Sequence, residues 1–338
     1  MVRSLTLYIE TMTYRNMLVT GGCGFIGSNF INKHWEENEG TLIVNLDAMY
    51  YCAKETNIHK HIRNSERYIF VEGNICDSDL VYHLLKTYDI DIVVHFAAQS
   101  HVQDSFTDSA KYVRDNVVGT HTLLEASRKY GELLKFIHIS TDEVYGESLL
   151  SDSQKKTEQS VLCPTNPYAA TKASAELLAT SYHHSFKLPI IITRGNNVYG
   201  PNQYPEKLIP KFIKQLKEGK KVTIQGDGSN VRGFLHVCDV TNAIDVVIEY
   251  GVIGEVYNIG SEKDDEFSVR DIAKGLILMI KKDQKFLCEE DYEPYIEYIE
   301  DRPFNDKRYF ISNQKMKELG WIPEVGFLEG LTELIGGT

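Results

Sequence analysis

The sequence predicts an α/β fold in which a parallel β-sheet is covered by helices on both faces. Two observations predict it. Short apolar segments alternate with segments of helical periodicity through the first half of the chain, and a glycine-rich turn joins the first strand to the first helix. The 338 residues are enough for one large α/β domain and a smaller one.

The first strand and helix enclose that turn. Residues 17–20 form an apolar run that predicts a buried strand, and apolar residues recur at helical spacing from 25 to 31. The turn reads as Gly-x-Gly-x-x-Gly from Gly22 or as Gly-x-x-Gly-x-x-Gly from Gly21. Glycines here permit a tight turn and the close approach of a pyrophosphate, while the helix N-terminus offers free N–H groups to its oxygens.

The second strand, 41–46, ends in Asp47. A carboxylate about 20 residues after such a turn is suited to accept hydrogen bonds from an adenosine ribose, which favours NAD over NADP. The alternative interpretation is an ordinary loop followed by a surface aspartate. Because both features occur in register, we favour a dinucleotide site.

The remaining elements complete a Rossmann-type doubly wound parallel sheet. Strands are expected at 68–71, 91–96, 136–140 and 189–193, and helices at 79–86 and 112–130, the latter with Val113, Val117, Leu123 and Leu124 on one face. After residue 195, prolines and the turn 226–228 interrupt the pattern. We therefore expect an extension at 1–15, a Rossmann domain from 16–195 plus 236–251, and a smaller α/β C-terminal lobe from 196–235 plus 252–338.

Composition limits the functional classes. A net charge of -12 argues against binding to nucleic acid, and no apolar run is long enough to span a membrane. The six cysteines are scattered, which is typical of reduced thiols, and residues 1–15 lack the features of a signal peptide. The histidines, including His183 and His184, show no metal-ligand spacing, so no metal is expected. A cytoplasmic location follows.

Tyr168 and Lys172 lie four residues apart on a predicted helix, so their side chains share one face. A phenol titrates near pH 10, but a nearby ammonium and an oxidised nicotinamide both favour the phenolate. Tyr168 could then accept the proton of a substrate hydroxyl while hydride passes to NAD. Taken alone, such a pair is more often part of an ordinary amphipathic helix.

Two adjacent carboxylates, Asp142 and Glu143, follow the fifth strand, where this fold opens its ligand cleft. Buried together, one of them should hold a proton at neutral pH. A protonated acid beside an ionised base is what the elimination of water requires. The alternative is a solvated acidic turn.

These motifs resemble the extended short-chain dehydrogenases, and within them the nucleoside-diphosphate-glucose 4,6-dehydratases. The likeness runs from about residue 16 to residue 321. It covers the stretches 21–27, 95–102, 140–146, 166–168, 194–201, 205–210, 226–232 and 301–306.

The resemblance implies a role for each catalytic candidate. Tyr168, assisted by Lys172 and Thr141, would oxidise the sugar at C4, with hydride passing to NAD and later returning to C6. Glu143 would remove the C5 proton, and Asp142 would protonate the departing C6 hydroxyl. Related epimerases lack the Asp-Glu pair, and related GDP-mannose dehydratases have Ser-Glu in its place.

The resemblance also implies binding residues and a partner. The cofactor NAD would contact Gly21, Gly24, Phe25, Ile26, Gly27, Asp47, Asn74, Ile75, Ala97, Ala98, Tyr168 and Lys172. The C-terminal lobe would help to hold the nucleotide sugar, whose contacts would be Ser100, Thr141, Asn197, Lys207, Leu208, Arg232 and Arg302. A homodimer through helices such as 112–130 and 166–187 is implied, although those apolar faces could equally be buried within one subunit.

The nucleotide is inferred from smaller differences. Gln99, Phe304 and Asn305 depart from the bacterial dTDP-glucose dehydratases and resemble the UDP-glucose 4,6-dehydratase part of plant-type rhamnose synthases. UDP-glucose, on a route towards UDP-rhamnose-type deoxysugars, is therefore the expected substrate. The alternatives are dTDP-glucose, a nucleotide-sugar 4-epimerase, or a non-catalytic NAD-binding regulator. Uracil and thymine differ by one methyl, worth only about 1–3 kcal/mol in a pocket.

Overall fold

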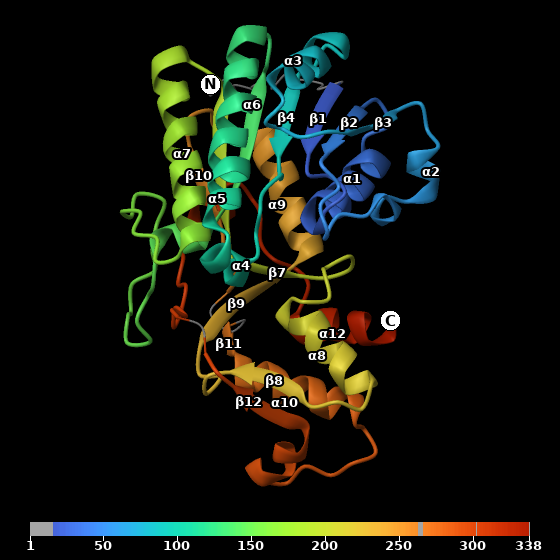
Figure 1. Cartoon of the computed structure of the whole chain (residues 1–338), viewed down its shortest axis with the longest axis vertical. Coiled ribbons are helices and arrows are strands. Elements are labelled where there is room, and N and C mark those ends of the chain that lie inside the picture. Colours follow the sequence, from blue (N-terminus) through green and yellow to red (C-terminus); the bar gives the residue numbers. More distant parts are fainter. Residues whose placement is uncertain (1–15, 263–265, 302, 338) are drawn as a thin grey trace, which may run out of the picture.

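The computed structural model describes residues 16–262, 266–301 and 303–337. A seven-stranded sheet, with every neighbouring pair parallel, forms the larger part of the molecule (Figure 1). Its order is β10-β6-β5-β4-β1-β2-β3. The chain adds β2 and β3 on one side of β1 and then crosses to add β4 and the later strands on the other side. The strands are β1 (Asn16–Thr20), β2 (Leu42–Asp47), β3 (Tyr68–Glu72), β4 (Ile92–His95), β5 (Lys135–Thr141), β6 (Ile190–Gly195) and β10 (Val256–Ile259). The predicted doubly wound parallel sheet is confirmed.

Alternate side chains of each strand enter two separate cores. Met17 and Val19 of β1 pack with helices α1 (Phe25–Glu37) and α9 (Val237–Tyr250) on one face. Leu18 faces the other way, towards α3 (Ser78–Thr87), α6 (Gly119–Tyr130) and α7 (Pro167–Phe186). Figure 1 shows α3, α6 and α7 side by side on that face. Both faces of the sheet are thus buried, as the continuous apolar strands require.

Two features of this domain differ from the expectations. The segment 112–130 is not one helix: α5 (Ser109–Tyr112) passes into a π-helical turn at Val113–Val118 before α6 begins. A π-helical turn holds more residues than an α-helical turn, so the residues before it are rotated about the helix axis relative to α6. Val113 is therefore half exposed instead of facing the core with Leu123. Strand β10 falls in the range assigned to the smaller lobe, yet it pairs with β6 of the large sheet. The strand was not predicted because four residues give little signal in sequence.

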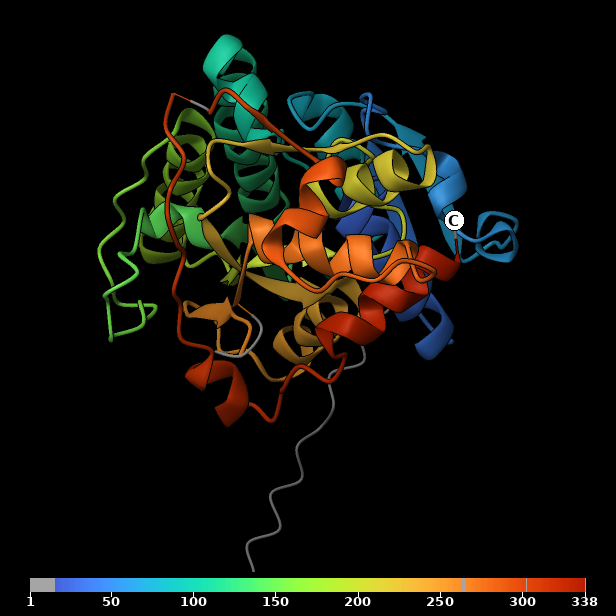
Figure 2. The same cartoon turned by 90° about the horizontal axis from the view of Figure 1, so that it is seen from below.

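The smaller lobe lies beyond the carboxyl ends of the large sheet. It contains β7 (Asn197–Tyr199), β9 (Val231–His236) and β11 (Glu266–Ser268) in one sheet, and β8 (Val222–Gln225) with β12 (Ile296–Ile299) in another. Its helices are α8 (Leu208–Lys217), α10 (Val269–Ile280) and α12 (Phe327–Gly336), which share an apolar core around Phe212, Leu276 and Leu331. Figure 2, seen from below, shows α8, α10 and α12 lying across the end of the larger domain.

The shorter helices occur in connections and after β10. They are α2 (Lys60–Arg63), α4 (Val102–Thr107) and α11 (Gln314–Glu318). No helix among the described residues combines the length and the apolar character that crossing a membrane demands.

Candidate active site

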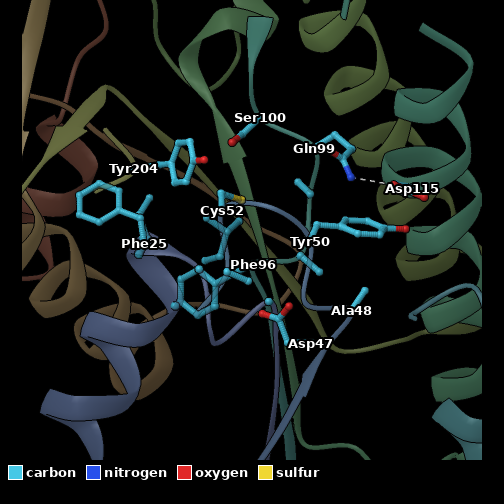
Figure 3. Close-up of a pocket in the computed structure, with 18 of the residues that line it drawn as sticks. Phe25, Asp47, Ala48, Tyr50, Cys52, Phe96, Gln99, Ser100, Asp115 and Tyr204 are labelled. Atoms are coloured by element: carbon cyan, nitrogen blue, oxygen red, sulfur yellow. Dashed lines mark hydrogen bonds between the residues drawn. The ribbon is translucent and has the colours of Figure 1, made fainter. Parts of the chain in front are cut away.

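Two neighbouring hollows at the carboxyl ends of the strands form one continuous cleft. They share lining residues from both parts of the molecule, among them Phe25, Ser140, Tyr168 and Lys207. Every residue predicted to bind the cofactor lines the first hollow, part of which is drawn in Figure 3. The second hollow is lined by Ser100, Thr141, Asn197, Lys207, Leu208 and Arg232 of the predicted substrate contacts, whereas Arg302 lies outside the described residues.

The glycine-rich turn fits tightly against the residues that follow β4, the neighbour of β1 in the sheet. Gly21 has a φ of 73°, and a Cβ atom there would lie 2.7 Å from the backbone nitrogen of Ala97. A Cβ at Gly27 would lie 2.5 Å from the carbonyl oxygen of Gly21. The N-cap of α1 is Gly24, whose lack of a side chain leaves the first amides of the helix uncapped. These are the features of a turn that receives a diphosphate.

Asp47, at the end of β2, is buried and lines the first hollow. Its Oδ2 accepts a hydrogen bond from the Cys23 amide at 2.9 Å, and its Oδ1 accepts one from the Met49 amide at 2.8 Å. Burial raises the pKa of this carboxyl, while both amide bonds oppose the rise. Each oxygen keeps a second lone pair, so Asp47 can hold the turn and still accept from a ribose hydroxyl.

Two further polar residues that sequence reasoning did not select, Tyr50 and Asp115, line this hollow and contact residues that it did select. The Gln99 amide donates to Asp115 Oδ2 at 2.8 Å, the dashed contact in Figure 3, and the Asn74 amide donates to the Tyr50 hydroxyl at 2.9 Å. Tyr50 follows β2 in a loop, and Asp115 occupies the π-helical turn. No motif marks either position, so only the fold brings them to the cleft.

Tyr168 and Lys172 lie on the first turns of α7, both more than nine-tenths buried. Lys172 Nζ donates to the Ile139 carbonyl at 2.7 Å, and burial lowers the pKa of Lys172 to about 8. Burial, followed by the charges of Glu143 and Asp142, raises the pKa of Tyr168, while hydrogen bonding to Thr141 lowers it. The protein alone therefore holds Tyr168 as a neutral phenol, in contrast to the lowered pKa expected from Lys172.

The acid pair follows β5 in a short 3-10 turn, Asp142–Tyr145. Asp142 is 1% exposed and does not line the cleft. Its Oδ2 accepts from Asn196 Nδ2 at 2.5 Å, and its Oδ1 accepts from the Thr141 hydroxyl at 3.2 Å. Burial, and then the charge of Glu143, raises the pKa of Asp142 to about 7. A proton is therefore held at the pair near neutral pH.

Glu143 lines the second hollow and is held from two sides. Asn166 Nδ2 donates to its Oε2 at 2.9 Å, and the Tyr309 hydroxyl lies 3.4 Å from the same oxygen. That hydroxyl donates to Asp306 at 2.5 Å, and Asp306 also accepts from Thr165. Burial raises the pKa of Glu143, and the Asn166 hydrogen bond is the largest opposing influence.

Asn166 immediately precedes α7 and is its N-cap residue. Its side-chain oxygen accepts from the Ala169 amide at 2.9 Å, while its side-chain NH2 also positions Glu143. Asn305, noted as a departure from the bacterial enzymes, accepts from Arg232 at 3.2 Å. Arg232 also lies 4.8 Å from the centre of the Tyr309 ring, so it faces the cleft beside Glu143.

Comparisons with known proteins agree with this geometry. The family described as GDP-mannose 4,6 dehydratase matches residues 18–334. A trifunctional UDP-glucose 4,6-dehydratase, 3,5-epimerase and reductase of Arabidopsis thaliana is 47% identical over 96% of this chain and 47% of its own length. Human dTDP-D-glucose 4,6-dehydratase is 45% identical over 95% of this chain and 89% of its own. The chain thus spans about half the length of the plant relatives it matches.

A solved structure is similar over nearly its whole length. The dTDP-glucose 4,6-dehydratase of Bacillus anthracis, in complex with NAD, superposes with a TM-score of 0.84 at 40% identity, covering 95% of each chain. The family match and these identities together assign the chain. It belongs to the GDP-mannose 4,6-dehydratase family, within the extended short-chain dehydrogenases.

Proposed function

We propose that this chain is an NAD-dependent UDP-glucose 4,6-dehydratase that forms UDP-4-keto-6-deoxyglucose, a precursor of UDP-rhamnose-type sugars. The observation that carries the proposal is that the side chains suited to oxidise the sugar and the acid pair suited to eliminate water meet at one cleft. Tyr168 and Thr141 line it beside Glu143, and Asp142 is hydrogen-bonded to Thr141. An epimerase or a nucleotide-binding regulator has no use for a buried acid pair at this position.

The first hollow has the shape and donors for NAD. The close fit of Gly21 against Ala97 suits the diphosphate, and Asp47 retains acceptor capacity for the adenosine ribose. When bound, NAD supplies a two-electron oxidation at C4 of the sugar and the matching reduction at C6. Its positive nicotinamide would also offset the acid charges that raise the pKa of Tyr168.

The chain's own groups account for the proton movements. Tyr168 accepts the proton of the C4 hydroxyl, with Thr141 as its hydrogen-bond partner, and Lys172 lines the same hollow. The C4 ketone acidifies the C5 proton, which Glu143 removes. Asp142 has a pKa of about 7 and does not line the cleft, so it supplies the proton for the departing C6 hydroxyl through the Thr141 hydroxyl, which does line it. A C5–C6 double bond forms as water leaves. When hydride returns to C6, Glu143 would give its proton back to C5, and the proton left on Tyr168 balances the one that Asp142 gave up.

UDP-glucose is proposed over dTDP-glucose because of Gln99 and Asn305. Gln99 pairs with Asp115 in the first hollow, and Asn305 holds Arg232 in the second. A carboxylate in place of Gln99 would instead face Asp115 with a like charge. The relatives named for UDP-glucose and for dTDP-glucose have similar identities to this chain, 47% and 45%. The proposed preference for UDP-glucose therefore rests on Gln99 and Asn305 and not on overall identity.

The test is incubation with UDP-glucose and dTDP-glucose in parallel, followed by mass spectrometry. We expect loss of one water from both, with a higher kcat/KM for UDP-glucose, and no loss with Tyr168→Phe. Intact mass with both sugars would refute the dehydratase. Intact mass with an inverted C4 would indicate an epimerase, and a higher kcat/KM for dTDP-glucose would refute the substrate assignment.

We also propose a homodimer formed through α6, α7 and the π-helical turn. Val113, Val118, Leu177 and Phe186 are apolar side chains between 47% and 63% exposed on these elements. Their burial against a second copy would remove them from water. Analytical ultracentrifugation should give a dimer, and Leu177→Asp should shift it to monomer; a monomeric wild-type chain would refute the proposal.

A further inference from the structure

Three side chains with metal-ligating atoms meet on the surface of the larger domain, outside the cleft. Glu36 lies in the last turn of α1, His59 precedes α2, and His61 lies within it. Glu36 Oε1 is 3.1 Å from His59 Nδ1 and 3.2 Å from His61 Nε2. None of the three lines either hollow. The sequence showed no metal spacing here because Glu36 is distant along the chain from the histidines.

The distances match those of a metal's ligand shell. Ligands about 2.0–2.2 Å from a zinc-like ion lie roughly 3.0–3.5 Å from one another in octahedral or tetrahedral arrangements. Both Glu-to-His distances already fall in that range, and all three donor atoms lie within 4.8 Å of one another. The remaining adjustment is a small rotation of two imidazoles whose side chains are more than half exposed. Two imidazole nitrogens and one carboxylate oxygen suit Zn²⁺ and Cu²⁺.

The scaffold beneath these side chains is rigid. Ile58 and Ile62, which flank the two histidines, are fully buried, so the segment presents His59 and His61 outward. The His59 backbone amide donates to the Asn32 side chain at 2.9 Å. The His61 ring packs edge-on against Trp35, 5.7 Å between centroids, and Arg67 covers that indole at 3.9 Å.

We propose that Glu36, His59 and His61 form a surface site for one divalent ion of the Zn²⁺ or Cu²⁺ class, with solvent completing its coordination. The ion would join α1 to the segment 54–61. That segment also holds the glycine-rich turn, because the Asn57 side chain and the Lys54 amide both donate to the Cys23 carbonyl. Metal binding should therefore stabilise the folded chain.

The test uses full-length protein without a histidine tag, stripped of metal by a chelator. Zn²⁺ titration by calorimetry should show one site per chain, and 100 µM Zn²⁺ should raise Tm by a few degrees. Cu²⁺ electron paramagnetic resonance should show coupling to two imidazole nitrogens. His59→Gln and His61→Gln should each weaken Zn²⁺ binding at least tenfold, and the double variant should abolish the rise in Tm.

His83→Gln provides the matched control, because His83 is also exposed on the same domain but hydrogen-bonds only to Thr87 among the contacts described. It should bind Zn²⁺ as the wild type does. Equal affinity of the His59→Gln/His61→Gln double variant and the wild type would overturn the proposal, as would a copper signal with a single coupled nitrogen. Dehydratase activity plays no part in these readouts.

Discussion

Substitution of Asp142 by asparagine should stabilise the protein in a pH-dependent way. Burial and the charge of Glu143 raise the pKa of Asp142 from 3.8 to about 7. As pH rises, the unfolded chain loses this proton at a lower pH than the folded chain does. The free energy of unfolding is therefore unaffected below about pH 4 and falls progressively as pH rises towards 7. At pH 8 the penalty is about 4 kcal/mol. Asparagine stays neutral. Its amide oxygen can still accept from Asn196, and the Thr141 hydroxyl can rotate to accept from its NH2 group.

Urea unfolding at a series of pH values from 4 to 8 measures this effect. The Asp142→Asn variant should match the wild type near pH 4 and exceed it by a few kcal/mol at pH 8, while losing dehydratase activity. Asp283→Asn, which removes an exposed carboxylate, should change stability by less than about 0.5 kcal/mol at every pH. A stability difference that is constant with pH would refute the buried-charge reasoning.

Three other changes test the remaining contacts. Asn166→Ser keeps a helix cap but loses the 2.9 Å bond to Glu143, so the pKa of Glu143 should rise and the acidic limb of kcat/KM against pH should move up by about one unit; an unmoved limb would count against it. Tyr309→Phe removes a hydroxyl held near Glu143, and should lower kcat about tenfold with KM unchanged; an effect on KM alone would contradict a positioning role. Gly21→Ala forces a side chain onto a residue with a φ of 73°, so NAD affinity should fall more than tenfold by fluorescence titration, whereas Gly40→Ala, with open space around its Cβ, should bind normally; intact NAD binding by Gly21→Ala would exclude the tight turn.

Sequence reasoning succeeded where local patterns carry a physical constraint. The glycine-rich turn and Asp47 were found because a tight strand-to-helix turn and a strand-terminal carboxylate leave a recognisable order in the chain. Helical spacing predicted that Tyr168 and Lys172 share one face of a helix, and both lie on α7 and line the first hollow. The six predicted strands were found because both faces of a parallel sheet are apolar.

The residues that were missed act through contacts between distant segments. Tyr309 reaches Glu143 across 166 positions, and Asn196 reaches Asp142 across 54. A π-helical turn at Val113–Val118 also has no sequence signature, because one inserted residue changes only the phase of an otherwise helical pattern. Such pairings depend on the topology of the sheet and are invisible to any local period.

The same burial that makes the acid pair costly also separates its two roles. Asp142, bonded to Asn196 and Thr141 and almost wholly shielded, is the acid whose proton is held to about pH 7. Burial raises the pKa of Glu143 as well, but the Asn166 hydrogen bond and the charge of Arg232 oppose that rise and favour its ionised form. In the proposed mechanism, two neighbouring carboxyls of similar intrinsic acidity would thereby act as a proton donor and a base. If water solvated the pair, the energetic cost of burying the two carboxyls would disappear. The difference in their pKa values, on which the proposed elimination depends, would disappear with it.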